Sequence, residues 1–327
     1  KLAMPLVYML TAGVALYAWD MSFNRVLAST VQGLLITLGL LWIIFGAILL
    51  LNTLKHSGGI TAIRAGFATI SPDRRIQAII IAWLFGCFIE GASGFGTPAA
   101  IAAPLLVAIG FPAMAAVMLG MLVQSTPVSF GAVGTPIIVG INTGLDSATI
   151  GAQLVEQGSS WAQFLQLITS EVAIIHATVG TVMPLVMVLM LTRFFGAEKS
   201  WKAGFEVLPF AIFAGLAFTV PYVLTGVFLG PEFPSLAGGL IGLAIVTSAA
   251  RMGFLLPKTT WDFAPADKWP AEWLGTVEMK LDDLTAKPMS ALRAWLPYVL
   301  VGVLLVISRV FPEVSAALKS VALKFPD

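Results

Sequence analysis

Long apolar stretches recur along this chain, and six of them suit helices that cross a lipid bilayer. A bilayer core of about 30 Å needs about 20 helical residues. The stretches are Ala3–Ala18, which is short, Val31–Leu54, Val172–Thr192, Phe205–Phe228, Ser235–Phe254 and Trp295–Phe311. Only 11% of the 327 residues are charged, whereas a soluble domain has about 25%. The sequence therefore predicts an all-α integral membrane protein that crosses the bilayer several times.

Composition argues against several other classes of protein. The formal net charge is only +1, so we expect no nucleic-acid partner. Cys87 is the only cysteine, and His56 and His176 are the only histidines, which argues against a disulfide and against a metal site. The sequence also lacks a glycine-rich nucleotide-binding loop. We therefore expect no metal or other cofactor and no direct drive by ATP.

The region from residue 76 to residue 142 is apolar but is interrupted by clusters of Gly, Pro, Ser and Thr. It leaves four uninterrupted pieces: 76–91, 97–109, 113–126 and 135–141. At 1.5 Å per residue the first is about 24 Å long and the second about 20 Å, so neither crosses a bilayer alone. Irregular backbone at membrane depth is tolerated only inside protein or against a watery cavity. Such interrupted segments are typical of the binding sites of secondary transporters.

Positive charge identifies the cytoplasmic loops of a membrane protein. Three or more Lys or Arg residues occur in each of the loops 55–75, 193–204 and 255–293, which are predicted to be cytoplasmic. Neither residue type occurs in 142–160 or 229–234, which are predicted to be outside. The C-terminal tail disagrees, since it is predicted outside but carries two lysines.

An odd number of crossings must then connect the first cytoplasmic loop to the outer segment. The simplest solution makes 76–109 a re-entrant hairpin that enters and leaves on the cytoplasmic side. Segment 113–141 is then one crossing, broken near its middle. Segment 161–171 is expected to lie along the outer interface before 172–192 crosses back. The predicted fold has seven crossings, one re-entrant hairpin and one broken transmembrane helix.

Two similar motifs occur in the interrupted region, Ser93-Gly-Phe-Gly-Thr-Pro98 and Ser129-Phe-Gly-Ala-Val-Gly-Thr-Pro136. Thr is a good N-cap and Pro suits the first helical turn, so each motif predicts a helix N-terminus at membrane depth. Such ends attract anions, by roughly 0.3–1 kcal/mol each and up to about 2 when partly buried. The alternative is that the motifs merely cap ordinary helices across a kink. The predicted substrate-binding residues are Ser93, Gly94, Gly96, Thr97, Ser125, Thr126, Ser129 and Thr135.

Two titratable residues are candidates for proton coupling. Glu90 lies at the predicted hairpin tip, and a carboxylate at membrane depth is costly enough that it usually has a function. Its alternative role is structural, as an acceptor for backbone N–H groups at the tip. His176 is predicted near the outer end of 172–192, where it either relays protons or is simply packed.

The chain resembles the L-lactate permease family at Gly86-Cys-Phe-Ile-Glu-Gly-Ala-Ser-Gly-Phe-Gly-Thr-Pro98 and at Ser125-Thr-Pro-Val-Ser-Phe-Gly-Ala-Val-Gly-Thr-Pro136. Ile70-Ser-Pro-Asp-Arg-Arg75 and Leu229-Gly-Pro-Glu-Phe-Pro234 also resemble this family. The resemblance implies symport of lactate, and often of glycolate, with protons across the bacterial inner membrane. It also implies an inverted-repeat fold built from hairpins and broken helices.

Members of that family are considerably longer, so we expect residues 1–327 to be a single transporter region and a fragment that holds one of two halves. Within this fragment we expect residues 76–141 to contain the substrate site and residues 255–293 to form a cytoplasmic loop. The expected partners are L-lactate, glycolate or D-lactate, protons and membrane lipid. The oligomeric state stays open.

Three alternatives compete with a proton-coupled monocarboxylate transporter: a Na⁺-coupled carboxylate transporter, an intramembrane enzyme, and a channel, which would need a pore ring formed by an oligomer. A Na⁺-coupled transporter of di- or tricarboxylates would favour an extra buried cation, and no Lys or Arg lies between residues 76 and 142. An intramembrane enzyme would need paired catalytic groups at one depth, and only Glu90 is clearly deep, so we expect no enzyme. Uptake of an anion against an inside-negative potential costs about 2.3 kcal/mol per charge per 100 mV, so a cation must accompany it. The residues leave open whether that cation is H⁺ or Na⁺.

Overall fold

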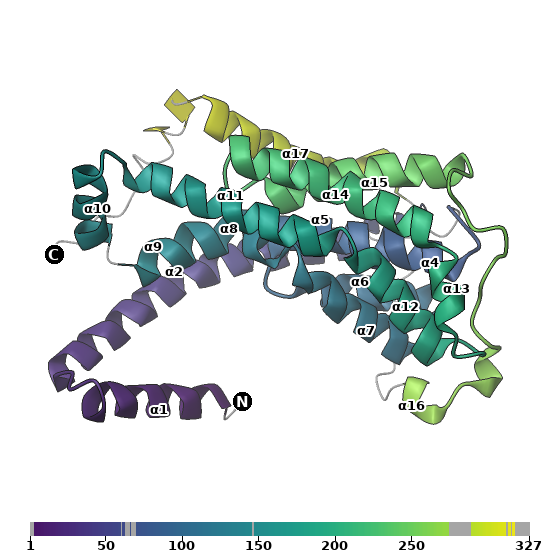
Figure 1. The fold of residues 1–327 in the computed structure, drawn as a ribbon, viewed down its shortest axis with the longest axis horizontal. Coiled ribbons are helices and arrows are strands. Elements are labelled where there is room, and N and C mark those ends of the chain that lie inside the picture. The colour runs from purple at the N-terminus through teal and green to yellow at the C-terminus, as the bar shows by residue number, and fades with distance from the viewer. Residues whose placement is uncertain are drawn as a thin grey trace. The chain divides into compact units, whose positions relative to one another are not determined.

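The computed structural model describes residues 3–59, 61–62, 66, 70–145, 147–274, 289–311, 313–314 and 316–317. Every regular element within these residues is a helix, which confirms the predicted all-α class (Figure 1). The chain divides into two compact units, Lys1–Leu49 and Leu50–Asp327. In the first unit the Tyr8 hydroxyl and Thr30 Oγ1, 2.8 Å apart, join the first two helices.

The longer helices outside the interrupted region begin and end close to the predicted crossings, although α2 begins well before Val31. They are α1 (Ala3–Tyr17), α2 (Phe23–His56), α14 (Leu208–Phe228), α15 (Pro234–Arg251) and α17 (Ala291–Val310). Shorter helices stand between them: α9 (Asn142–Gly144), α10 (Ser147–Glu156), α13 (Trp201–Phe205), η5 (Ala266–Lys268) and α16 (Ala271–Leu274).

Four helices among the described residues are long and apolar enough to cross a membrane: Arg74–Ser93, Trp161–Phe195, Leu208–Phe228 and Pro234–Arg251. A fifth crossing results if the bent pair Ala113–Ser125 and Val128–Ile141 forms one span. This confirms a polytopic membrane protein. The total of seven crossings stays a prediction.

The predicted hairpin over 76–109 is present as a pair of helical arms. The first arm is one continuous helix made of α4 (Arg74–Gln77), the π-helical η1 (Ala78–Phe85) and α5 (Gly86–Ser93). The second arm, α6 (Thr97–Ala108), packs back against η1 and α5.

Both ends of the hairpin lie together, because Arg74 Nη1 donates a hydrogen bond of 2.6 Å to the Ile109 carbonyl. The expected length of the first arm was wrong, however. Its 20 residues make it about 30 Å long, enough to cross a bilayer. The helix begins earlier than expected because Asp73 caps it, accepting a 2.8 Å hydrogen bond from the Arg75 amide.

The predicted broken helix over 113–141 is also present. It begins with α7 (Ala113–Leu122) and continues through two 3₁₀ turns, η2 (Val123–Ser125) and η3 (Val128–Phe130), to α8 (Gly131–Thr135) and the π-helical η4 (Pro136–Ile141). The helical segments before and after the break are inclined by 67°.

Segment 161–171 is not a separate interfacial helix, so that expectation was wrong. α11 (Trp161–Gly180) and α12 (Met183–Phe195) together form one apolar helix of 35 residues. A capping box between Ser160 and Gln163 starts this helix. Gln166 Nε2 then donates to the carbonyls of Gly226 and Val227, both at 2.8 Å, near the end of α14. These contacts hold the segment along the bundle.

Glycines let the hairpin lie directly against α15. A Cβ at Gly91 would lie 2.6 Å from the Leu236 amide nitrogen, and one at Gly239 would lie 2.6 Å from the Phe88 Cα. A Cβ at Gly242 would meet the Leu84 side chain at 2.9 Å. Close backbone approach at small residues is how helices associate in membranes. The hairpin arm and α15 are therefore held backbone to backbone.

We expect Gly91→Ala to destabilise the protein, because its methyl group would meet the backbone of Ser235 at 2.7 Å and of Leu236 at 2.6 Å. Overpacking of this kind costs about 1–3 kcal/mol. The apparent unfolding temperature in detergent should fall by several degrees. Gly140→Ala is the control, since no described atom lies within 4 Å of a Cβ there. Equal stability of the two variants would contradict the contact between α5 and α15.

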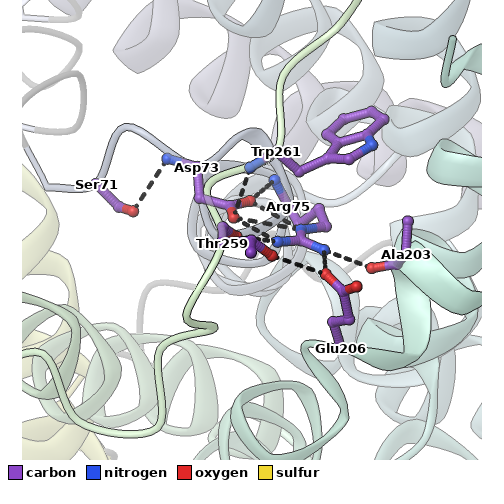
Figure 2. Close-up of polar contacts among 7 residues, drawn as sticks. All are labelled: Ser71, Asp73, Arg75, Ala203, Glu206, Thr259 and Trp261. Atoms are coloured by element: carbon purple, nitrogen blue, oxygen red, sulfur yellow. Dashed lines mark hydrogen bonds and ion pairs between the residues drawn. The ribbon is translucent and has the colours of Figure 1, made fainter.

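A buried ionic cluster stands at the start of the hairpin (Figure 2). Arg75 is 0% exposed and contacts Asp73 Oδ2 at 2.7 Å, Glu206 Oε2 at 3.0 Å and the Thr259 carbonyl at 2.7 Å. Its hydrogen bond also holds the pKa of Glu206 below its usual range. Asp73 in turn accepts a 3.1 Å hydrogen bond from the Trp261 amide.

This ionic cluster joins segments from the three loops predicted to be cytoplasmic: 55–75, 193–204 with Glu206 just beyond it, and 255–293. In Figure 1 the labels α4, α13 and α16 accordingly lie at the same end of the second unit. The common location agrees with one shared side for these loops. That this side is cytoplasmic stays a prediction.

Candidate functional site

The two sequence motifs form similar backbone turns, which differ at their first residue, where ψ is −159° at Gly94 and 53° at Ala132. In the hairpin tip Gly94, Phe95 and Gly96 have φ angles of 62°, 54° and 77°. In the broken helix three successive residues, Ala132, Val133 and Gly134, have φ angles of 42°, 58° and 76°. Each motif is therefore a left-handed turn that leads into Thr-Pro and a new helical segment.

Left-handed backbone is costly for residues other than glycine, by roughly 1–2 kcal/mol each. Phe95, Ala132 and Val133 nevertheless adopt it. Strained backbone that is held by its surroundings tends to cluster at functional sites. The two turns are thus a candidate site on conformational grounds as well as by sequence.

The two left-handed turns touch. A Cβ added to Gly94 would lie 2.6 Å from both the amide nitrogen and the Cβ of Ala132. Position 94 therefore needs glycine for its φ angle and for this contact. The hairpin tip and the break in the second helix form one structure rather than two separate kinks.

Neither threonine caps a helix through its side chain, although Thr135 is the N-cap residue of η4, so the predicted side-chain caps were wrong. Thr97 Oγ1 donates to the Gly94 carbonyl at 2.8 Å, and Thr135 Oγ1 donates to the Ala132 carbonyl at 2.5 Å. Each hydroxyl closes its own left-handed turn. Gly96 is the N-cap residue of α6 and provides no side-chain acceptor. α6 therefore has no side-chain cap, although the Thr97 amide donates to the Gly94 carbonyl at 3.1 Å and Pro98 has no amide hydrogen.

Ser93 extends this arrangement in the hairpin. Its Oγ donates to the Ile89 carbonyl at 2.8 Å and lies 2.5 Å from Thr97 Oγ1. Ser125, by contrast, is exposed and donates to the Leu122 carbonyl at 2.8 Å within its own helix. Ser125 is thus the predicted residue least engaged with the turns.

Glu90 lies between the two turns. Its side chain is buried, and the Gly96 amide lies beside its carboxylate. On the other side, a Cβ at Gly131 would lie 2.8 Å from Glu90 Oε1. Glu90 Oε2 has no hydrogen-bond partner among the described residues. The carboxylate therefore contacts the hairpin tip and the broken helix at once.

His176 lies at the second break and not near the outer end of a crossing, so that placement was wrong. Its helix begins at Trp161 instead of 172, which puts His176 well inside it. Nδ1 lies 2.9 Å from the Thr126 carbonyl, so it carries the donated proton. Nε2 lies 3.4 Å from Ser129 Oγ.

Sequence reasoning missed several residues that complete the site. The Tyr222 hydroxyl donates to the Thr126 carbonyl at 3.0 Å, and Ser235 Oγ donates to the Pro127 carbonyl at 2.8 Å. Glu232, predicted in an outer loop, is only 5% exposed. The neighbouring Pro231 carbonyl lies against Gly134. The segment Leu229–Pro234 gave a signal, because it is one of the stretches that resemble the permease family.

The arrangement offers hydroxyl groups, uncapped helix amides and one buried carboxylate. In the described part of the chain no group of three or more His, Cys, Asp or Glu residues is placed to hold a metal ion. The structure gathers Ser93, Gly94, Gly96 and Thr97 around the first turn and Thr126, Ser129 and Thr135 around the second. Binding at these residues stays a prediction.

The structure places a hairpin and a broken helix among apolar helices, and the turns of the two contact each other. These features define a polytopic membrane protein with interrupted helices. The family model for L-lactate permease matches residues 1–325. The chain belongs to the L-lactate permease family.

Three relatives illustrate the range of similarity. The L-lactate permease of Escherichia coli K12 is 31% identical over 287 residues, covering 87% of this chain and 46% of the relative. A putative L-lactate permease of Haemophilus influenzae is 36% identical over 258 residues, covering 79% and 44%. The glycolate permease of Escherichia coli K12 is 32% identical over 249 residues, covering 76% and 40%.

The matched regions thus amount to less than half of the length of these relatives. No solved structure matches this chain.

Proposed function

We propose that this chain takes part in the transport of lactate, or of a closely related monocarboxylate, across the bacterial inner membrane together with protons. The observation that carries the proposal is the pair of touching left-handed turns with Glu90 between them. Membership of the permease family and relatives named for lactate and glycolate support the same substrate class.

The substrate carboxylate is proposed to bind at the two turns, near the uncapped start of α6. Helix N-termini attract anions by roughly 0.3–1 kcal/mol, and by up to about 2 kcal/mol when partly buried. Hydroxyl groups at the turns provide further hydrogen bonds when they rotate away from the carbonyls to which they donate here. The proposed contacts are Ser93, Gly94, Gly96, Thr97, Ser125, Thr126, Ser129 and Thr135. Because no Lys or Arg lies between 76 and 142, the site suits a single negative charge.

Glu90 is the first candidate for the residue that binds the coupled proton. Its buried carboxylate touches both turns, so its charge acts directly on an anion that binds there. His176 is the second candidate, because its Nε2 faces Ser129 while Nδ1 contacts the Thr126 carbonyl.

The proposal is tested by uptake of labelled L-lactate into proteoliposomes that contain the complete protein. An inside-alkaline pH gradient should drive accumulation, and excess unlabelled glycolate should compete. A Na⁺ gradient without a pH gradient should give no accumulation. Accumulation driven by Na⁺ alone, or absence of lactate uptake under all gradients, would overturn the proposal.

We expect Thr97→Val and Thr135→Val each to weaken lactate binding. Each change keeps the side-chain shape but removes the hydroxyl that closes a turn, at 2.8 Å and 2.5 Å respectively. Loss of the hydrogen bond that each hydroxyl is proposed to make with the substrate costs about 0.5–2 kcal/mol, so the Kd should rise roughly 2- to 30-fold.

Thr178→Val is the matched control for these two variants. Its hydroxyl donates to the Ile174 carbonyl at 2.8 Å on the exposed face of α11. Its lactate affinity, measured with labelled substrate, should equal that of the wild type. If all three variants bind lactate as the wild type does, the carboxylate binds elsewhere.

A further inference from the structure

The carboxylate of Glu90 lies at the start of α6. A helix N-terminus is also the place where a bound anion would lie. The amide of Gly96, the N-cap residue of α6, lies beside this carboxylate. Glu90 is only 1% exposed, and its Oε2 has no hydrogen-bond partner within the described part of the chain. An ionised Glu90 therefore resembles an anion bound at this helix end.

Among the residues that the structure describes, no counter-ion pairs with the charge of Glu90. The elements packed against α5 are α15, α8, α6, η1, η2 and η3. Among them the only charged side chain is Arg251 at the far end of α15, and Cys87 on α5 itself is the only other titratable group. Because Gly91 meets Leu236, Arg251 is fifteen residues, or about 22 Å, further along α15.

The other titratable groups around the site do not supply a positive counter-charge to Glu90 either. Glu232 is acidic and precedes α15, and the Tyr222 hydroxyl donates to the Thr126 carbonyl. The two ring nitrogens of His176 contact the Thr126 carbonyl and Ser129 Oγ, and neither contacts Glu90. Arg75, at the start of the same helix, is fifteen residues and about 22 Å away. Glu90 and an anion bound beside it therefore favour a total of one negative charge.

We propose that ionised Glu90 and the substrate carboxylate are alternative occupants of one anion position at the start of α6. Protonation of Glu90 opens that position to the substrate. This inference rests on the proposed transport of a monocarboxylate. Two carboxylates that close together, without a counter-ion, do not both stay ionised.

The step is balanced in charge and in protons. A proton from water converts the Glu90 carboxylate to the neutral acid, and no other bond forms or breaks. The substrate anion then takes the helix amides, and the protonated oxygen donates a hydrogen bond to it. Glu90 and the substrate together carry one negative charge both before and after the substrate binds, so one proton accompanies each monocarboxylate. This also explains how the site binds an anion without Lys or Arg.

Equilibrium binding of labelled L-lactate to the complete protein in detergent tests this inference, between about pH 5 and about pH 9. Lactate itself stays ionised over that range. Wild-type affinity should fall about tenfold per pH unit once Glu90 ionises. Glu90→Gln should bind lactate with an affinity that is independent of pH. Glu90→Asp should restore the pH dependence, and Glu171→Gln, an exposed carboxylate on α11, should retain the wild-type slope.

A second measurement does not depend on any variant. In weak buffer at alkaline pH, lactate binding to the wild type should take up about one proton per bound anion, because the neutral acid forms as the anion enters. Binding without proton uptake, or a Glu90→Gln variant that keeps the wild-type slope, overturns this inference alone. A wild-type protein that binds no lactate at any pH overturns the proposed function as well.

Discussion

Arg75→Ala is expected to produce the largest loss of stability of any single change considered for this protein. Arg75 is completely buried, and its removal leaves the Asp73 carboxylate, only 3% exposed, without its counter-ion. Removing one partner of a buried ion pair typically lowers the free energy of unfolding by about 3–5 kcal/mol. It also removes the hydrogen bonds to the Thr259 and Ala203 carbonyls. The hairpin would then be detached from two other segments of the bundle.

The effect is measured as the apparent unfolding temperature in detergent, followed by loss of the monodisperse peak in size-exclusion chromatography. Asp262→Ala is the matched control. It removes the 3.0 Å ion pair with Arg74, but Asp262 is 60% exposed at its side chain. An exposed pair contributes about 0–1 kcal/mol. If Arg75→Ala unfolds no earlier than Asp262→Ala, Arg75 does not hold these segments together.

The hairpin and the broken helix could be predicted because their cause is local. Gly-Thr-Pro sequences interrupt apolar runs wherever they occur, and loop charge gives the direction of each connection. Similar residues before Thr97 and Thr135 correctly indicated similar backbone at the two turns. The sequence could not indicate that Gly94 would touch Ala132, since that contact depends on how the two elements pack.

The predictions that were wrong failed because contacts between distant segments, which the sequence does not show, decided the structure there. Sequence placed the threonines as N-caps, but left-handed residues before them direct their hydroxyls to carbonyls of the turn. It placed 161–171 at the interface, whereas Gln166 holds that segment against the end of α14. Arg75 was indistinguishable from the other loop cations. Its partners Glu206 and Thr259 are 131 and 184 positions away in the chain.

Glu90→Gln is expected to abolish accumulation of lactate. Without a titratable group between the turns no proton is bound with the substrate, so lactate moves only down its own electrochemical gradient. An inside-negative potential of 100 mV opposes an anion by about 2.3 kcal/mol, which corresponds to roughly 50-fold less lactate inside than outside. The accumulation ratio should therefore fall below one, whatever the imposed pH gradient.

Exchange distinguishes a coupling role from a loss of structure. With equal lactate concentrations on both sides, labelled lactate should still exchange for unlabelled lactate in Glu90→Gln vesicles, because Gln keeps the shape and neutral charge of the protonated acid. Glu171→Gln should both accumulate and exchange as the wild type does. Accumulation that still follows the pH gradient in Glu90→Gln would remove Glu90 from proton coupling and leave His176 as the remaining candidate. Loss of exchange together with loss of the monodisperse peak would identify Glu90 as a structural brace of the two turns.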